Sequence, residues 1–406
     1  MSDIDYGNPN TTPPMAQAIP LGLQHVLAMF ASNVTPAVIV AGAAGLAFGG
    51  ADQLYLIQMA MLFAGVATLL QTVGMGPIGA RLPIMQGTSF AFVGVLAGVA
   101  ATQGLSVALT ACLIAGIIHF ALGSVIQKLR FLFPPLVTGL VILAIGLYLI
   151  PVAIKYAAGG AAEFQMNADS FGSLMHWTVA LTVVVVALAF KFLTKGTASN
   201  AAILIGLIAG YVVAFLFGMV NFGGIVKASW FQIPTIMPYG FEFSLGAVIG
   251  VTLVSIVSAI ETVGDTSATT KAGAGRDATD EEIAGATYAD GLGTAVAAVF
   301  GGLPNTSFSQ NVGIVGMTGI MSRHVVTIAG AILIVCGLIP KIGAVISSMP
   351  LPVLGGGVIV MFGMVAAAGM NMLTEITMTR RNMVIISVSL AVGLGLNLVP
   401  SAVQYL

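Results

Sequence analysis

Charged side chains are scarce in this sequence. Asp, Glu, Lys and Arg make up 7% of its 406 residues, and 58% are hydrophobic, whereas a soluble domain carries roughly 25% charged residues. The formal net charge of −1 offers no basic face for a nucleic acid. The only two cysteines, Cys112 and Cys336, lie in separate apolar runs, so no disulfide framework or metal cluster is indicated. These deficits exclude a soluble domain and predict a multi-pass protein of the lipid bilayer.

Several functional motifs are also missing. The polar, acidic residues 1–17 do not have the basic start and short apolar core of a cleavable signal peptide. No phosphate-binding G-x-x-x-x-G-K-[ST] loop occurs, so nothing supports ATP coupling within this chain. No Ser/His/Asp order or metal-ligand spacing stands out. A membrane-embedded enzyme is therefore not expected.

Long apolar runs, in contrast, are abundant. A membrane-crossing helix needs about 20 mostly apolar residues. Thirteen spans are predicted, at 18–44, 54–74, 84–102, 105–125, 134–154, 174–193, 199–220, 243–264, 285–302, 306–320, 325–346, 351–369 and 382–400. A cytoplasmic N-terminus places ten Lys and Arg residues on the cytoplasmic side and only Lys155, Lys227 and Lys341 on the other, as the positive-inside rule requires.

Two motifs recur at nearly one offset. Thr88-Ser89-Phe90 returns 218 residues later as Thr306-Ser307-Phe308, and Pro135-x-x-x-Gly139-x-Val141-Ile142 returns 217 residues later as Pro352-x-x-x-Gly356-x-Val358-Ile359. This predicts a duplicated unit of seven spans. Seven is odd, so the second copy runs upside down, as in secondary transporters with inverted repeats. The span at 199–220 then has no counterpart, and we expect a fourteenth span to be missing.

The spans at 84–102 and 306–320 begin with polar residues. The second follows the stretch 304–313, which starts with Pro304 and holds six side chains that can form hydrogen bonds. Irregular backbone at membrane depth must be buried in protein or line a cavity, so both are predicted to be broken helices that meet at a ligand. In the first, Gln86 to Phe92 sets small polar residues beside aromatic rings, which suits a flat, partly polar ligand.

Three acidic residues lie in or near predicted spans. Glu261 and Asp265 are one helical turn apart at the end of the span 243–264, and Asp290 lies in 285–302. Ionisable groups in a membrane are costly and are functional candidates by default. Alternatively, the span ends near residue 260 with both residues at the interface, and Asp290 only bonds a neighbouring helix. We expect 265–284 to be a cytoplasmic loop.

Taken together, these motifs resemble the nucleobase–ascorbate transporter family, also called nucleobase:cation symporter family 2, which contains the xanthine and uracil permeases. Its signature Q/E-N-x-G-x-x-x-x-T-[RKG] is matched by Gln310 to Gly319. Gln24-His25, Gln86 to Phe90, and Glu261 to Asp265 agree with three further family motifs. The resemblance extends over essentially the whole chain, except that family members have fourteen spans.

This resemblance implies an all-α polytopic fold of two inverted seven-span repeats, with short strands in the third and tenth spans. It implies a cytoplasmic tail (1–17), a core domain (18–125 and 243–346) and a gate domain (126–242 and 347–406). It further implies proton symport across the bacterial inner membrane, an elevator-like movement of the core, and a homodimer through the gate. The proton is the coupling ion, and no other cofactor is implied.

The resemblance also implies roles for individual residues. Glu261 accepts hydrogen bonds from ring N–H groups of a nucleobase, Gln310 bonds its amide edge, and Phe90 stacks on the ring. Backbone amides near Ser89 and Phe308 complete the contacts. Ser309 is included in the substrate set. The implied supporting or proton-coupling residues are Gln24, His25, Asp265, Asp290, Asn311 and Thr318.

The residue at 310 indicates the substrate. Family members with Gln there tend to carry xanthine or uric acid, and those with Glu tend to carry uracil. An amide offers a donor and an acceptor together, whereas a carboxylate only accepts. We therefore expect a purine importer, with uracil second. Glu261 is the expected proton carrier, with Asp265 or Asp290 as rivals. An anion transporter of the sulfate-permease type and a passive channel are less consistent alternatives, the former because an anion site would avoid Glu261.

Overall fold

The computed structural model describes residues 5–129, 134–160, 163–164, 166–374 and 376–399. The elements of the first repeat are α1 (Met15–Ala43), α2 (Ala51–Val73), β1 (Gln86–Thr88), the 3-10 helix η1 (Phe90–Phe92), α3 (Val93–Gln103), α4 (Leu105–Leu122), α5 (Ile126–Leu129), α6 (Pro135–Ala157), α8 (Leu174–Leu193), α9 (Thr197–Asn200), α10 (Ala202–Leu216) and α11 (Gly223–Lys227). The elements of the second are α12 (Leu245–Ala274), α13 (Asp280–Val299), β2 (Asn305–Ser307), α14 (Ser309–Thr318), α15 (Arg323–Leu338), α16 (Pro340–Ser347), α17 (Leu351–Thr374) and α18 (Arg380–Leu398).

Helices occupy most of the apolar runs, because a helix satisfies its own backbone polar groups in lipid. Among the described residues, seven helices are long and apolar enough to cross a membrane, and the bent pair α15–α16 makes an eighth. Several other predicted spans are shorter: α10 has 15 residues and α14 has 10. The number of thirteen spans therefore stays a prediction, and so does the expectation that a fourteenth is missing.

The helix α12 is longer than predicted. It continues ten residues beyond 264, to Ala274, so the expected loop 265–284 is wrong, whereas the alternative of a membrane span that ends near residue 260 stays a prediction. The added turns are polar but still helical. In them, the side-chain hydroxyls of Thr266 and Thr269 donate to the backbone carbonyls four residues earlier. Gly275 then ends the helix in the left-handed conformation, at φ 64°. Apolarity marks the expected membrane boundary, not the end of the helix.

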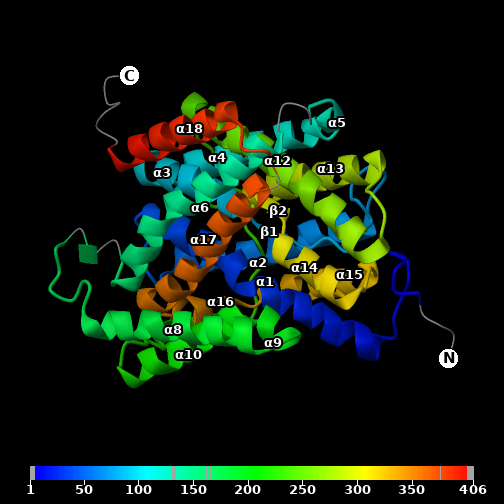
Figure 1. The fold of residues 1–406 in the computed structure, drawn as a ribbon. Coiled ribbons are helices and arrows are strands. Elements are labelled where there is room, and N and C mark those ends of the chain that lie inside the picture. Colours follow the sequence, from blue (N-terminus) through cyan, green and yellow to red (C-terminus); the bar gives the residue numbers. More distant parts are fainter. Residues whose placement is uncertain (1–4, 130–133, 161–162, 165, 375, 400–406) are drawn as a thin grey trace.

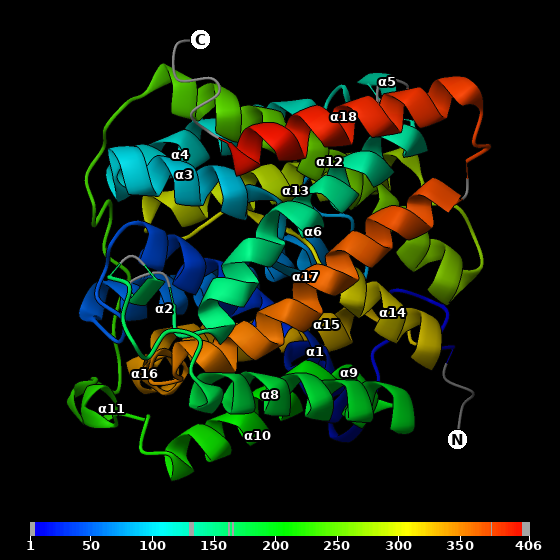
Figure 2. The ribbon, with the colours of Figure 1, turned by 60° about the vertical axis from the view of Figure 1, so that its left-hand side comes forward.

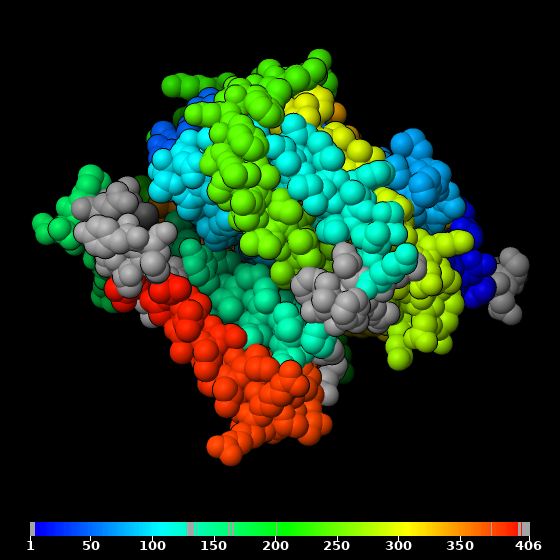
Figure 3. Space-filling model, turned by 90° about the horizontal axis from the view of Figure 1, so that it is seen from above, coloured from blue at the N-terminus to red at the C-terminus, as the bar shows by residue number. Residues whose placement is uncertain are grey.

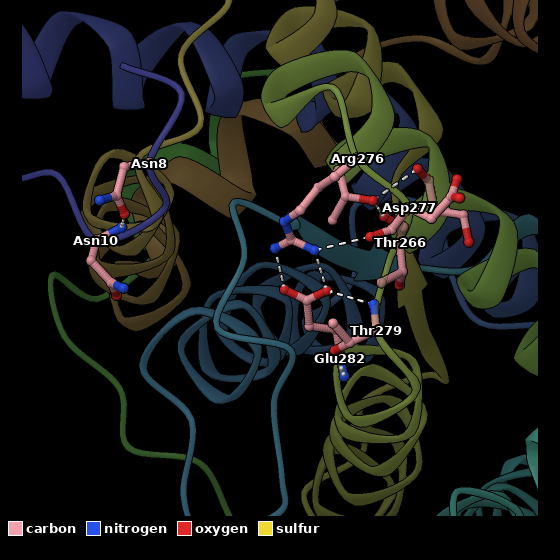
Figure 4. Close-up of polar contacts among 9 residues, drawn as sticks. Asn8, Asn10, Thr266, Arg276, Asp277, Thr279 and Glu282 are labelled. Carbon is pink, nitrogen blue, oxygen red and sulfur yellow. Dashed lines mark hydrogen bonds and ion pairs between the residues drawn. The ribbon is translucent and has the colours of Figure 1, made fainter. Parts of the chain in front are cut away.

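A short, well-bonded turn joins α12 to α13. Arg276 donates two hydrogen bonds to the carboxylate of Glu282, at 2.8 and 2.6 Å (Figure 4). Glu282 also accepts from the N–H of Thr279, whose hydroxyl accepts from the N–H of Glu282 in a capping box. Partial burial works against ionisation of Glu282, but these bonds outweigh it and lower its pKa. The turn fixes the start of α13.

The predicted span 325–346 is not one straight helix. α15 and α16 meet at an angle of 79°. Pro340 is the first residue of α16, and Ile339 before it is extended, with φ −107° and ψ 95°. Proline lacks an N–H and disfavours a helical conformation in the preceding residue, which accounts for the break.

The helices pack in two groups. The first group consists of α1 to α4 and α12 to α15, in which α2 lies along α15 and α13 along α4. The second group consists of α6, α8, α10, α17 and α18, in which α6 crosses α17 and α8 lies along α10 (Figures 1 and 2). In both groups, helices from the two repeats lie side by side. Seen from above, α6 and α18 lie on one side of the molecule, with α3, α4 and α12 on the other (Figure 3).

The expected N-terminal tail is partly folded onto the protein. Met321 donates its N–H to the carbonyl of Tyr6, at 2.7 Å, and Arg323 donates its N–H to the carbonyl of Pro9, at 3.0 Å. Within the tail, the side chain of Asn8 accepts a bond from the N–H of Asn10 (Figure 4). Residues 5–14 therefore cover the connection between α14 and α15.

Candidate functional site

The two broken segments meet at the centre of the molecule (Figure 1), where β1 and β2 form an antiparallel pair. Gly87 pairs with Thr306 and Thr88 with Asn305. Under the 218-residue offset, Asn305 is the counterpart of Gly87 and Thr306 that of Thr88, so each residue pairs with the counterpart of its neighbour. A two-fold axis between inverted repeats requires this exchange. The strand pair thus lies where the two repeats meet.

Contact between the two segments also occupies two backbone N–H groups that were expected to bind ligand. The N–H of Ser89 donates to the carbonyl of Pro304, at 2.9 Å, and the N–H of Phe308 donates to that of Met85, at 2.9 Å. These two N–H groups are therefore not available to a ligand in this conformation. In α14, which begins at Ser309, the N–H of Asn311 donates to the carbonyl of Phe308, at 2.9 Å, whereas the N–H groups of Ser309 and Gln310 have no backbone partner among the described residues.

A threonine from a neighbouring helix holds the start of each strand. Thr68 of α2 accepts from the N–H of Gln86, at 2.9 Å, and Thr294 of α13 accepts from the N–H of Asn305, at 3.0 Å. Each hydroxyl also donates to the carbonyl of the same residue. One hydroxyl thus satisfies both backbone groups at an irregular point in the apolar interior, where unpaired groups are costly.

Asp290 lies at the centre of a network of side-chain hydrogen bonds. Its carboxylate is fully buried and accepts from the side-chain amides of Gln71, at 3.0 Å, and Gln86, at 2.6 Å. It also accepts from the hydroxyl of Thr262, which lies 3.4 Å from that of Thr306. Asp290 therefore joins α2, α12 and both strands.

Asp265 holds the second half-helix. Its two carboxylate oxygens accept from the hydroxyls of Ser307, at 2.6 Å, and Ser309, at 2.8 Å. These serines lie on either side of the point where β2 becomes α14. The Ser309 hydroxyl, expected to contact substrate, is directed to Asp265 instead. Hydrogen bonds to a charged acceptor are about twice as strong as neutral ones, so Asp265 fixes where α14 begins.

The side chains of Glu261 and Gln310 differ from those of Asp265 and Asp290. Neither side chain has a hydrogen-bond partner among the residues that the structure describes. Glu261 lies one helical turn before Asp265, and Gln310 directly follows Ser309, whose hydroxyl bonds Asp265. Gln310 is exposed and Glu261 is partly buried. Their polar groups are free to bond a ligand.

Phe90 lies at the boundary between the two helix groups. Its ring meets that of Phe362 in α17 edge to face, with centroids 5.4 Å apart. Phe90 is partly exposed, whereas Phe308, its counterpart in the second repeat, is 5% exposed and packs against Met29 and Met85. Of these two rings, only the first is therefore partly exposed.

The start of α14 is also bonded to α1, through Asn311 and His25. Asn311 donates from its amide to the ring nitrogen Nδ1 of His25, at 3.1 Å, and to the His25 carbonyl, at 3.0 Å. Thr318 bonds within its own helix, to the carbonyl of Ile314. Gln24 is buried beside these contacts. Among the described residues, no three His, Cys, Asp or Glu side chains come together as a metal site.

Several supporting residues were missed at the level of the sequence. Asn33 of α1 accepts from the N–H of Thr88, at 2.8 Å, Thr68 and Thr294 hold the strands, and Gln71 bonds Asp290. All lie within predicted apolar spans. A polar side chain at such a position is a signal for a helix–helix or backbone contact, and this signal was present in the sequence for Asn33 and Gln71.

The fold defines the class of protein. It is similar to the solved transmembrane domain of the cyanobacterial bicarbonate transporter BicA, with a TM-score of 0.68 over 95% of this chain and 96% of that one. The sequences are 16% identical, so the likeness concerns the fold alone. The chain has the inverted-repeat fold of that transmembrane domain.

Sequence comparison then identifies the family. Residues 16–402 match the model described as the permease family. The uric acid permease PucK of Bacillus subtilis is 38% identical over 388 residues, 95% of this chain and 88% of that protein. The xanthine permease of the same organism is 36% identical over 396 residues, 96% and 88%. This chain belongs to the nucleobase–ascorbate transporter family, and it is a permease, not an enzyme.

Proposed function

We propose that this protein imports an oxopurine, xanthine or uric acid, together with a proton. The observation that carries this proposal is the contrast within one cluster of polar groups. Asp265 and Asp290 are bonded to protein groups, while Glu261 and Gln310 beside them have no partner among the described residues. The relatives named as uric acid and xanthine permeases support the choice of purine.

The chemistry of these groups fits an oxopurine. The carboxylate of Glu261 accepts from ring N–H groups, and the carboxamide of Gln310 both donates to an oxo group and accepts from the adjacent N–H. The ring of Phe90 offers an apolar face for the flat base. Together these three side chains recognise an N–H group, an oxo group and a ring face, which a small inorganic anion does not have.

Proton coupling follows from Glu261. An ionised carboxylate resists movement through a low-dielectric barrier, and protonation removes this cost when the base is bound. The first helix group then carries the base past the second in an elevator-like movement. The N-terminus is cytoplasmic, the membrane is the bacterial inner membrane, and two copies associate through the second group.

The test of this coupling separates transport driven by a pH gradient from exchange. In proteoliposomes, Glu261→Gln should abolish uptake driven by an imposed pH gradient but retain exchange of preloaded purine. Glu281→Gln, an exposed residue in the first turn of α13, is the control and should retain both. Gradient-driven uptake by Glu261→Gln at the wild-type rate contradicts the assigned role.

The test of the substrate uses position 310. Gln310→Glu loses a donor toward the oxo group, so affinity for xanthine and urate should fall by about 10- to 100-fold, as expected for one or two lost hydrogen bonds. Binding is measured on purified protein with xanthine, urate, guanine, hypoxanthine, uracil and ascorbate. A wild-type protein that binds uracil and no purine overturns the assignment in favour of a uracil permease.

A further inference from the structure

A hollow of about 500 Å³ has the supporting residues Gln24 and Thr318 in its lining, but not Glu261 or Gln310. It separates α1 and α14 of the first helix group from the α8–α9 connection of the second, and Figures 1 and 2 both show α9 beside α1. Its walls are Gln24, Thr194, Lys195, Gly196, Thr197, Ser199, Met317 and Thr318. Ligand pockets have volumes of about 300 to 1,000 Å³. Both helix groups contribute to this one.

Gln24 is the residue that points to a ligand. It is 7% exposed and lines the hollow, yet its carboxamide has no hydrogen-bond partner among the described residues. The buried side-chain atoms that lack a partner do not include this carboxamide, so the amide reaches the hollow and is available to a molecule that enters it. The amide offers the same donor and acceptor pair as Gln310.

The hollow continues from the site along one helix. Met317 and Thr318 lie seven and eight residues after Gln310 on α14, a distance of about 10 to 12 Å along the helix axis. Gln24 directly precedes His25, which contacts Asn311. A base that leaves Gln310 along α14 therefore reaches the hollow on the side of the N-terminus.

Lys195 gives the hollow its charge. It is the one charged residue in the lining. It is exposed, and it forms no ion pair with any described residue. Met317 adds an apolar surface beside the hydroxyl groups of Thr197 and Thr318. A cation, a free amide and an apolar surface together suit a flat anion that has oxo groups.

We propose that this hollow is a second subsite, which holds an anionic oxopurine such as urate on its way between the central site and the N-terminal face. The inference rests on the proposed purine transport. Gln24 bonds the edge of the base, and Lys195 pairs with its negative charge. Lys195 therefore selects by charge, whereas Gln310 selects by the pattern of donors and acceptors.

The experiment compares charged and neutral bases on the two faces of the membrane. In mildly acidic buffer urate is an anion and xanthine is neutral. With Lys195→Gln in membrane vesicles, KM for urate applied to the N-terminal face should rise about fivefold, the effect of one exposed ion pair. KM for xanthine on that face, and KM for urate on the opposite face, should stay unchanged. Lys195→Glu should raise KM for urate further.

The matched control is Lys191→Gln. Lys191 is exposed, lies one turn earlier in α8 and is not part of the lining, so all four KM values should equal those of the wild type. Equal changes for urate and xanthine, or no change in Lys195→Gln, overturn the subsite but leave the proposed function intact. A wild type that transports neither base overturns both.

Discussion

The two broken segments are counterparts in sequence, but they differ in what holds them. In the first, Ser89 accepts a bond from the N–H of Ala91, at 3.3 Å, within its own segment, and Phe90 meets the second helix group. In the second, Ser307 and Ser309 reach out to Asp265, and Phe308 is buried within the first group. Beyond the paired strands, the first segment is held by its own residues and its contact with α17, and the second by a carboxylate of α12.

This difference shows how a duplicated element takes on two tasks. The second segment is fixed by charge-assisted bonds, so that Gln310 is presented at a defined place. The first leaves its aromatic ring at the boundary that moves in the proposed transport cycle. The strand pair and the two threonines remain common to both. Substitutions at matching positions should therefore have unequal effects.

The largest effect is expected at Asp290, which holds both segments together. Asp290→Ala leaves the buried donors of Gln71, Gln86 and Thr262 unpaired, and we expect the free energy of unfolding to fall by about 4 kcal/mol. Thermal unfolding in detergent measures this. Asp290→Asn keeps one acceptor and should recover part of the loss; a wild-type melting temperature for the alanine variant contradicts the central role of Asp290.

The two phenylalanines should separate stability from binding. Phe308→Ala removes a buried ring and should lower the free energy of unfolding by about 3 kcal/mol. Phe90→Ala removes a partly exposed ring and should lower the free energy of unfolding by about 1 kcal/mol. When binding is measured on the folded fraction of each variant, Phe90→Ala should weaken purine binding more than Phe308→Ala does. Melting curves and equilibrium binding on both variants provide the comparison, and equal losses of stability contradict it.

A smaller effect is expected at Gly87, where the two segments approach most closely. A Cβ atom there would lie within 2.8 Å of Met29, Phe308 and Asn33, so Gly87→Ala should destabilise the protein by about 2 kcal/mol. Gly98→Ala is the control, because its Cβ would meet nothing within 4 Å and alanine favours the helix. A melting temperature that falls equally for both variants contradicts crowding at the strand pair.

The smallest effect is expected at Ser89, which is compared with Ser309. Ser309→Ala loses a bond to a charged acceptor and should cost about 2 kcal/mol, whereas Ser89→Ala loses a long bond to a backbone N–H and should cost about 0.5 kcal/mol. Chemical unfolding of the two variants gives the difference. If Ser89→Ala costs as much as Ser309→Ala, the two segments are held alike.

The sequence was informative about the fold wherever an apolar run determined it. Every predicted run from 18–44 to 382–400 contains helix, because lipid leaves few alternatives to the helix. It was uninformative where helix and membrane end at different residues. The polar turns of α12 up to Ala274 have no apolar pattern, and the bend at Pro340 could be placed only by proline chemistry.

Predictability of the site had a similar limit. The repeated Thr-Ser-Phe motif located both segments, and the signature located Gln310. Neither could show that the Ser309 hydroxyl bonds Asp265, or that the N–H groups of Ser89 and Phe308 are already paired. Such contacts join residues more than 40 positions apart, and only the packing of α12 against β2 and α14 decides them.

The pairing of β1 with β2 has a consequence for biogenesis. It joins residues about 220 positions apart in the chain, and such long-range contacts form late in folding because loop closure must come first. During membrane insertion, the first segment stays unpaired at membrane depth until the second emerges. The first repeat expressed by itself should therefore be a substrate for quality-control proteases, and co-expression of the second should protect it.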